Sequence, residues 1–302
     1  MSAGTETFSF YGALMTTPAV IAAPDEVRAV LADPAFVVPP VPNGGSPGGI
    51  VWLRSTVSRF SAKGDHERRR SLVVDELADV DPAVLGQRAL EQTTVLLKSV
   101  YEPIDVMAKI ARVVPIELLT EALSLPAGMS EDVNLVAEAY HPRGDFSATA
   151  DHAVARLVKA CGGIADETTA ARIGLLVQAC EATAGLIGNA LIAENRQKST
   201  TPVSAILTET LHMNPPVRAT RRQATADTRV GNFAIVAGEV VTLELAGSLT
   251  FGDGPRKCPG SEHAFAIASG IVEALRGREL VHDDVEYEAS ANLRVPASLL
   301  VR

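Results

Sequence analysis

The sequence predicts a mostly helical fold with a small β-region. Three observations support this prediction. Apolar residues recur at helical spacing in successive stretches of the chain. Prolines and glycines separate these stretches, as they do at the ends of helices. Between Val230 and Leu245 apolar and polar residues instead alternate, which is typical of short strands, with a turn expected at Ala237-Gly238.

The composition narrows the class of protein. With 302 residues and 47% hydrophobic residues, the chain can bury a full core, as one large domain or as two ordinary ones. A net charge of −9 argues against a general nucleic-acid binder, which needs a basic surface. Three scattered cysteines do not form a disulfide framework, and residues 1–11 lack the basic and apolar segments of a signal peptide. We therefore expect a cytoplasmic protein.

The first half of the chain contains several predicted helices. Pro24 and Asp25 begin a helix that runs to about Ala32, and residues 37–49 form an irregular loop rich in proline and glycine. After a turn at residues 61–65, His66 and Arg70 are four residues apart and share one helix face, although a run of arginines is often only a solvated surface. The further predicted helices are 81–98, 103–112, 115–124, 130–140 and 148–161.

The longest predicted helix begins at Asp166-Glu167. One face of it is apolar throughout, and that face carries Ile173, Val177, Cys180, Ala184, Ile187 and Leu191. Residues 175–193 are apolar enough to resemble a membrane span, but they include Glu181, whose insertion at mid-span costs about 2.5–3.5 kcal/mol. We interpret this segment as an internal helix, in which Glu181 must be paired, protonated or near water. Gly185 and Gly188 indicate that something approaches the helix closely.

The most informative stretch is the loop Phe251–Gly260, which precedes a helix predicted to begin at about Ser261. Cys258 lies just before that helix, where free backbone N–H groups and the helix dipole stabilise a thiolate. Gly254 and Gly260 allow close approach of the backbone to a flat group, and Arg256 provides a fixed charge for a carboxylate. Such a loop suits a metal-bound thiolate beneath a planar, anionic cofactor.

The loop contains the complete pattern Phe-x-x-Gly-x-Arg-x-Cys-x-Gly and closely resembles the haem-binding loop of the cytochrome P450 superfamily. The resemblance covers most of the chain from about Ala19 and implies a single, shortened cytochrome P450 domain over residues 1–302. It implies haem b as the cofactor, with Cys258 as the axial iron ligand. It also implies that Arg256 meets a haem propionate and that Phe251 packs near the sulfur.

Other segments resemble the family as well. His66 and Arg70 match a His-x-x-x-Arg pair whose side chains reach a propionate, and Arg222 is the best match for a third propionate ligand. On the long helix, Glu181 matches an acid that delivers protons during oxygen activation. Ala182 stands where a threonine usually follows, and Thr183 comes one residue later. Residues 285–287 and 292–301 resemble the closing β-hairpin of the family.

Two departures from the family pattern stand out. In the usual Glu-x-x-Arg pair Glu209 is present, but His212 replaces the arginine. A long segment that usually precedes Phe251 is reduced to residues 246–250. We expect Glu209 to pair with His212, Arg218 or Arg221, or to be open to water. The missing segment also raises the possibility of an apolar surface covered by a second copy of the chain.

The resemblance implies a monooxygenase that oxidises a small organic molecule with electrons from a ferredoxin-type or flavodoxin-type protein. Arg68, Arg256 and Lys257 would give that partner a basic surface. Two alternatives remain open. One is a haem-thiolate enzyme with peroxide-driven or non-monooxygenase chemistry. The other is a haem-free relative that stabilises a partner enzyme.

Overall fold

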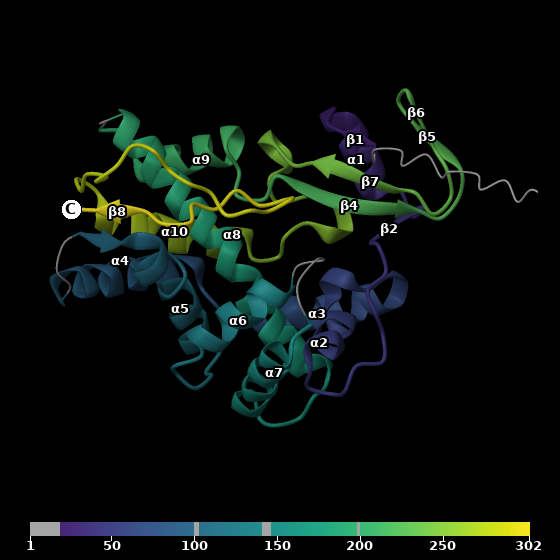
Figure 1. Cartoon of the computed structure of the whole chain (residues 1–302), viewed down its shortest axis with the longest axis horizontal. Coiled ribbons are helices and arrows are strands. Elements are labelled where there is room, and N and C mark those ends of the chain that lie inside the picture. The colour runs from purple at the N-terminus through teal and green to yellow at the C-terminus, as the bar shows by residue number, and fades with distance from the viewer. Residues whose placement is uncertain (1–18, 100–102, 141–145, 198–199) are drawn as a thin grey trace, which may run out of the picture.

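The computed structural model describes residues 19–99, 103–140, 146–197 and 200–302, so the predictions on residues 1–11 and on the break at Pro142 lie outside it. Helices dominate, as predicted (Figure 1). They are α1 (Pro24–Ala32), α2 (Ile50–Thr56), α3 (Lys63–Ala78), α4 (Pro82–Ser99), α5 (Val114–Ala122), α6 (Ser130–Tyr140), α7 (Ala148–Ala160), α8 (Glu167–Gln197), α9 (Val203–Met213) and α10 (Ser261–Leu275). Shorter turns are η1 (Ser58–Phe60), η2 (Met107–Ala111), η3 (Gly247–Leu249) and η4 (Gly254–Arg256).

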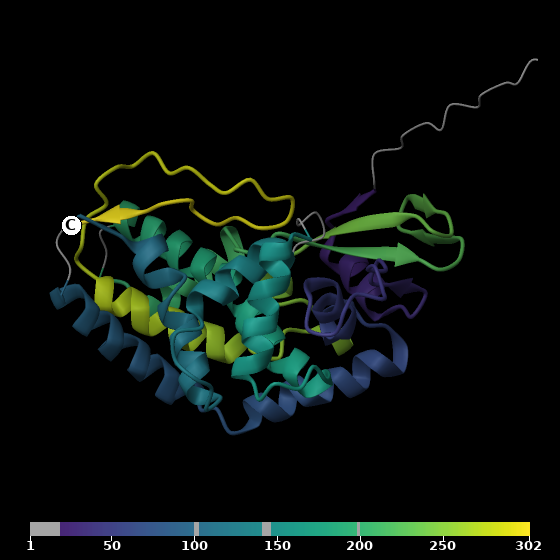
Figure 2. The same cartoon turned by 60° about the horizontal axis from the view of Figure 1, so that its bottom comes forward.

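A small sheet stands beside the helices (Figure 2). Its strand order is β1-β7-β4-β2, with β1 parallel to β7 and the other pairs antiparallel. Two strand pairs, β3–β8 and β5–β6, complete the β-region. The strands are β1 (Val20–Ile21), β2 (Phe36–Val37), β3 (Ile104–Asp105), β4 (Ala219–Ala224), β5 (Thr228–Val230), β6 (Phe233–Ile235), β7 (Val240–Glu244) and β8 (Leu300–Val301). The small predicted β-region is therefore confirmed, and the assignment of residues 1–302 to one domain stays a prediction.

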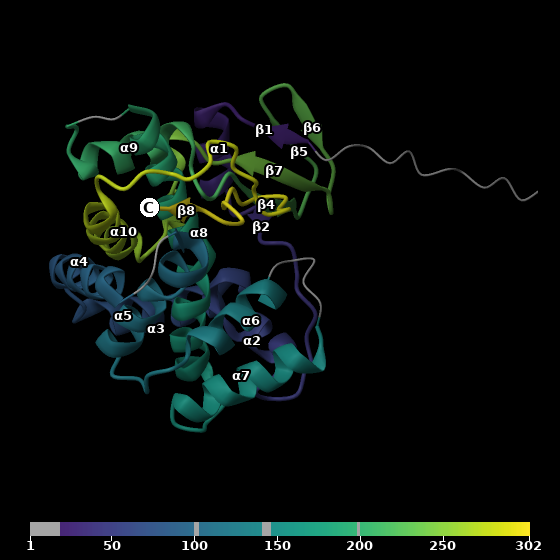
Figure 3. The same cartoon turned by 60° about the vertical axis from the view of Figure 1, so that its left-hand side comes forward.

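Helix α8 runs through the middle of the helical part and packs against α3, α5, α6, α9 and α10 (Figure 3). All six residues of its predicted apolar face are buried. Residues 167–195 are long and apolar enough to cross a membrane, but 72% of the most apolar window is buried inside the structure. The interpretation of this segment as an internal helix is confirmed.

The starts of the helices follow from local sequence. Asp81 accepts a hydrogen bond from the Ala83 amide at 2.8 Å, directly before Pro82 begins α4. Asp166 accepts one from the Thr169 amide at 2.8 Å and so caps α8. Both helix starts agree with the predictions. They could be predicted because each capping hydrogen bond joins residues that are neighbours in the sequence.

The predicted helix at 103–112 is wrong in its first half. Ile104 pairs with Val301 as part of β3–β8, and only η2, a π-helical turn, remains helical. Asp105 causes the change, because its carboxylate accepts hydrogen bonds from the Met107 amide at 3.0 Å and from the Ser298 hydroxyl at 2.8 Å. The second bond comes from a segment about 190 residues away in the sequence, so local spacing does not reveal it.

The turn expected at Ala237-Gly238 is confirmed, and strands β6 and β7 lie on either side of it. These two strands do not pair with each other, although neighbouring strands often do. Strand β6 turns back on β5 instead, at Gly231, whose φ of 53° suits a tight turn. Strand β7 pairs with β4 and β1 in the centre of the sheet.

Two glycines of α8 allow close packing, as predicted. A side chain at Gly185 would press on Pro216 and on the Arg294 carbonyl, and one at Gly188 would press on Met107 and Pro296. The C-terminal residues 285–297 thus lie directly on α8. They form an irregular hairpin in which Tyr287 bridges to Pro296, as the predicted closing hairpin requires.

Candidate functional site

The loop between β7 and α10 holds Cys258 in a fixed position. Gly252 and Gly254 have φ angles of 71° and 63°, which favour glycine, and they shape the turn. The Cys258 amide donates a hydrogen bond to the Phe251 carbonyl at 2.9 Å. Helix α10 begins at Ser261, as predicted, and buries Ile267, Ala268, Ile271 and Leu275 against the core. The thiol is therefore presented just before a helix that is anchored in the core.

The Cys258 thiol is accessible to solvent although protein surrounds it on most sides. Burial raises its pKa above the ordinary value, whereas a hydrogen bond from the Gly260 amide and the charges of Arg70, Arg59 and Lys257 act in the opposite direction. Burial has the larger effect, so the backbone donor and the three nearby cations offset only part of the cost of forming a thiolate here.

Two arginines join α3 and the segment before it to the cysteine loop. Arg70 Nη2 donates to the Lys257 carbonyl at 2.6 Å. Arg256 Nη2 donates to the Ser61 carbonyl at 2.6 Å. These two contacts connect residues that are 187 and 195 positions apart in the sequence. They bring the predicted His66–Arg70 pair and the predicted cysteine loop together.

His66 and Arg222 are the buried members of the same group, each with 6% of its surface exposed. Desolvation, followed by the charges of Arg256, Arg70 and Arg222, lowers the pKa of His66 to about 4. Desolvation and the charges of Arg256 and Arg59 lower the pKa of Arg222 to about 10. We call Arg59, His66, Arg70, Arg222 and Arg256 the basic cluster.

The basic cluster lacks negative partners within the described ranges of the chain. Its arginines form no ion pair with a carboxylate there, whereas other arginines, such as Arg68 and Arg69 on the same helix, do. Arg222 instead donates to the Arg221 carbonyl at 2.7 Å and to the Thr220 hydroxyl at 3.1 Å. The unpaired positive charge favours an anionic ligand. The accessible thiol beside it favours a ligand that also carries a metal ion or an electrophilic atom for the sulfur.

Sequence reasoning named four of the five members of the basic cluster and missed Arg59. It precedes the predicted turn at 61–65, and no spacing distinguishes it from a surface arginine. Arg222 was preferred over Arg221, and the alternation of β4 supports that preference, because Arg222 and Ala224 are buried on the same face. Phe251 packs against the edge of the main core, in agreement with a supporting role.

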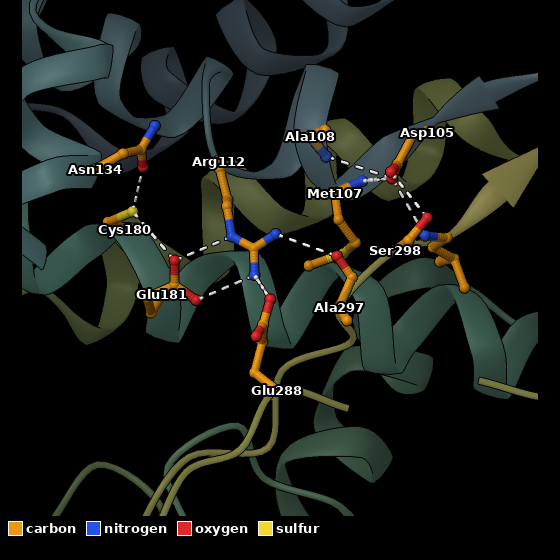
Figure 4. Close-up of polar contacts among 11 residues, drawn as sticks. Asp105, Met107, Ala108, Arg112, Asn134, Cys180, Glu181, Glu288, Ala297 and Ser298 are labelled. Atoms are coloured by element: carbon orange, nitrogen blue, oxygen red, sulfur yellow. Dashed lines mark hydrogen bonds and ion pairs between the residues drawn. The ribbon is translucent and has the colours of Figure 1, made fainter. Parts of the chain in front are cut away.

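Glu181 belongs to a separate network of polar side chains, which Figure 4 shows. Its carboxylate accepts hydrogen bonds from Arg112 Nε at 3.0 Å and from Arg112 Nη2 at 3.4 Å. Arg112 also contacts the Glu288 carboxylate at 3.2 Å. Burial lowers the pKa of Arg112, but the hydrogen bond and charge of Glu181 outweigh this effect and raise it overall. Glu181 is therefore paired, which is one of the three states that its position requires.

Two further α8 side chains complete this region. The Cys180 thiol donates to the Asn134 side-chain carbonyl at 2.9 Å, and burial followed by the charge of Glu181 raises the pKa of that thiol. Thr183 is buried, with 2% of its surface exposed, and it is not part of the Arg112 network drawn in Figure 4.

The altered Glu-x-x-Arg region lies at the surface. Glu209 and His212 are both exposed on α9, so the expectation that Glu209 is open to water holds. The short connector, residues 246–250 before Phe251, packs directly on α9. The His212 ring lies against Gly247, and the Thr250 hydroxyl donates to the Leu211 carbonyl at 2.6 Å. Met213, which is 74% exposed, is the large apolar side chain of α9 that the connector leaves uncovered.

Replacing His66 by glutamine is expected to reduce the acid sensitivity of the anion-free protein. The folded-state pKa of about 4 lies below the ordinary 6.5, so the unfolded chain binds more protons between these pH values. The stability linked to neutral His66 is thus complete above pH 6.5 and is lost as the pH falls towards 4, by up to about 1.4 kcal/mol per pH unit. Urea unfolding across this range measures the difference. An exposed control, His152→Gln, should retain the wild-type profile, and an unchanged profile in His66→Gln contradicts a buried, neutral His66.

The fold is that of the cytochrome P450 proteins. P450BioI, solved with an acyl carrier protein carrying hexadec-9Z-enoic acid, is similar with a TM-score of 0.78 at 18% identity, covering 92% of this chain and 90% of that chain. The tirandamycin C-bound P450 monooxygenase TamI matches with a TM-score of 0.73 at 20% identity, covering 94% and 89%. CYP164A2 of Mycobacterium smegmatis matches with a TM-score of 0.72 at 21% identity, covering 93% and 90%. No family model and no curated protein match the chain.

Proposed function

We propose that the protein is a haem-thiolate monooxygenase that oxidises a small organic molecule, with Cys258 as the axial ligand of haem b. The observation that carries this proposal is the accessible Cys258 thiol beside a basic cluster that has no carboxylate partner within the described residues. Haem b combines an iron ion with two propionate carboxylates, so one group would satisfy both features. The cytochrome P450 fold supports the same assignment.

The donor set fits haem better than a bare metal ion. The described residues contain no group of three or more His, Cys, Asp or Glu side chains that could hold a metal by themselves. A metal bound at Cys258 would therefore take further ligands from a cofactor. His66, Arg70, Arg222 and Arg256 would hold the propionates, and their negative charge would offset the mutual repulsion of these side chains.

The residues around Cys258 stabilise its thiolate and fix the position of the sulfur. The Gly260 amide and the nearby cations stabilise the thiolate against the effect of burial. Phe251 and Gly254 fix the loop that carries the sulfur, through the Phe251 carbonyl and through the left-handed backbone of Gly254. The backbone angles of Gly260 are open to any residue, and a side chain there would contact only Leu77, at 3.7 Å. The protein therefore leaves space beside Gly260 that a flat group could fill.

When bound, thiolate-ligated haem would supply oxygen activation, with electrons from a ferredoxin-type or flavodoxin-type protein. The basic surface predicted for the electron-donor protein has less free positive charge than expected, because Arg68 is paired with Asp65 and Glu167. Arg256 is half-buried and held by the Ser61 carbonyl. Lys257 is the exposed cation that remains of the three. We propose a cytoplasmic location, where the three scattered cysteines would stay reduced.

This reduced surface favours a second candidate function, an oxidation driven by hydrogen peroxide. In such a reaction peroxide supplies the oxygen atom and is reduced to water. It is already two electrons more reduced than O2, so no protein electron donor is needed. Product formation with peroxide alone, compared with product formation with a reduced ferredoxin, distinguishes the two candidates. Faster turnover with ferredoxin supports the monooxygenase.

Replacing Glu181 by glutamine is expected to slow turnover strongly, while Thr183→Ala should have little effect. We propose that Glu181 carries protons to the site, since Ala182 cannot donate or accept a hydrogen bond with its side chain. Thr183 is turned about 100° further around the helix. Arg112 keeps the Glu181 carboxylate oriented through two hydrogen bonds. The rate of product formation is the measurement, and the opposite order of effects contradicts this assignment.

The absorption spectrum of the purified protein tests the proposed function. After reduction and addition of carbon monoxide, the main haem band should move to the position typical of thiolate ligation. Protein that takes up no haem after supplementation would contradict the enzyme and leave only the accessory role.

A further inference from the structure

Arg54 on α2 is a buried cation outside the basic cluster. Only 3% of its surface is exposed, and its Nε and Nη1 atoms have no hydrogen-bond partner. It forms no ion pair with any described carboxylate, in contrast to Arg69 further along the chain, which binds Glu167. A buried guanidinium with free N–H groups is costly, because burial removes water without replacing it.

Aromatic side chains surround this guanidinium. Its carbon lies 5.0 Å from the ring centre of Phe60 and 4.9 Å from that of Phe146. Tyr140, at the end of α6, also packs on Phe60, with 5.2 Å between the ring centres. Tyr140 is buried as well, and its hydroxyl also lacks a hydrogen-bond partner. The structure therefore gathers one cation and one hydroxyl, both unsatisfied, within an apolar surround.

Electrostatics agree with a missing anion. Desolvation lowers the pKa of Arg54; Tyr140 opposes this effect in part, and the charge of Arg59 adds to it. Burial raises the pKa of Tyr140, so its hydroxyl stays a neutral donor at physiological pH. An anion between these groups would receive hydrogen bonds from both and would remove the cost of burying the charge.

Arg59 connects this place to the cysteine loop. Its charge acts on Arg54 and Tyr140 and also on Arg222 and Cys258. The guanidinium carbon of Arg59 lies 5.8 Å from the ring centre of Phe60, which Arg54 and Tyr140 also contact. Arg54 and Tyr140 therefore lie next to the basic cluster. They belong to α2 and α6, which pack against each other and do not contribute to the cysteine loop.

We propose that Arg54 and Tyr140 bind the carboxylate of the substrate, so that the enzyme acts on an organic acid with an apolar body. This inference rests on the proposed function for the identity of the reaction. A carboxylate suits the site because its two oxygens match the guanidinium donors and one phenolic donor. Phe60 and Phe146 suit the apolar body that follows the carboxylate.

Calorimetric titration of the haem-loaded protein tests this proposal with matched probes. Benzoate and decanoate are each compared with their primary amides, which keep the shape and lose the charge. We expect each acid to bind about tenfold more tightly than its amide, as a charge-assisted hydrogen bond to Arg54 requires. Equal binding of acid and amide, or no binding of either, overturns the proposal.

Two variants assign the preference to these residues. Arg54→Gln should remove the preference for the acid, and Tyr140→Phe should weaken acid binding by about three- to tenfold. Arg88→Gln is the control, because Arg88 is exposed and already paired with Glu121, and it should bind like the wild type. An acid preference that survives Arg54→Gln overturns the proposal.

The haem content of Arg54→Gln separates two sources of a carboxylate. If Arg54 recognises substrate, the variant keeps its haem and its thiolate-type spectrum. Loss of haem would assign Arg54 to a propionate and overturn the proposal. If the wild type itself takes up no haem, the proposed function fails, while the same titrations on the haem-free protein still report the acid preference.

Thermal unfolding without ligand excludes a purely structural role. Because Arg54 is buried without a partner, Arg54→Met should keep or raise the unfolding midpoint, by up to about 2–4 °C. A midpoint lowered by several degrees would show that stacking on Phe60 and Phe146 is the purpose of this arginine and would overturn the proposal.

Discussion

Replacing Cys258 by serine is expected to abolish the thiolate-type absorption of the reduced, carbon monoxide-bound protein. Serine offers an oxygen that stays protonated at neutral pH, so it cannot replace the thiolate that the Gly260 amide and nearby cations stabilise. The measurement is the difference spectrum, together with the haem content of each preparation. We expect the band to disappear completely, which makes this the largest effect predicted for a single side chain.

The other two cysteines provide matched controls. Cys161 is half-buried at the end of α7, and Cys180 is bound to Asn134, away from the cysteine loop. Cys161→Ser and Cys180→Ser should keep the thiolate-type band. Cys258→His tests whether the band disappears only because haem is lost. Imidazole is also an iron ligand, so this variant should keep haem and give a different band. A thiolate-type band in Cys258→Ser would show that Cys258 is not the ligand.

Replacing Arg112 by methionine is expected to lower the free energy of unfolding by about 2–4 kcal/mol at neutral pH. Arg112 is the cation between Glu181 and Glu288, and its side chain and that of Glu181 are only 17% and 22% exposed. Without it, two carboxylates face each other in a largely buried place. The same change removes a hydrogen bond to the C-terminal segment, because Arg112 also donates to the Ala297 carbonyl at 3.5 Å. Chemical unfolding measures the loss.

A double variant tests the cause of that loss. Arg112→Met combined with Glu181→Gln removes the unpaired charge, so it should be more stable than Arg112→Met alone. Arg88→Met serves as the surface control, because the Arg88–Glu121 pair is 50% and 63% exposed and should contribute less than about 1 kcal/mol. If the double variant is less stable than Arg112→Met, the unpaired charge of Glu181 does not cause the loss of stability.

Most helices could be predicted because their signals are local. Helices α1, α4, α6 and α8 begin at Pro24, Pro82, Ser130 and Glu167, each within one residue of the predicted start. A cap or an N-terminal proline acts within one turn of the chain, so the sequence contains the whole interaction. The apolar face of α8 is equally visible, because its period alone identifies the buried side.

The strand pairings could not be predicted in the same way. Residues 104–105 belong to a strand only because residues 300–301 pair with them, and β7 joins β4 and β1 instead of its neighbour β6. Strand formation depends on a partner that local spacing does not identify. Asp105 illustrates this dependence, since its decisive hydrogen bond comes from Ser298.

By itself the sequence determined the cysteine loop, because Phe251, Gly254, Arg256, Cys258 and Gly260 lie within ten residues and act through their own backbone. It also indicated His66, Arg70 and Arg222 as partners of that loop. Only the tertiary structure decided which charges are paired. It joins Glu181 to Arg112 and Arg68 to Glu167, and it leaves Arg54 and Arg222 buried without a carboxylate within the described residues. Whether a charge is satisfied depends on which distant segments meet, and that is a property of the packed molecule alone.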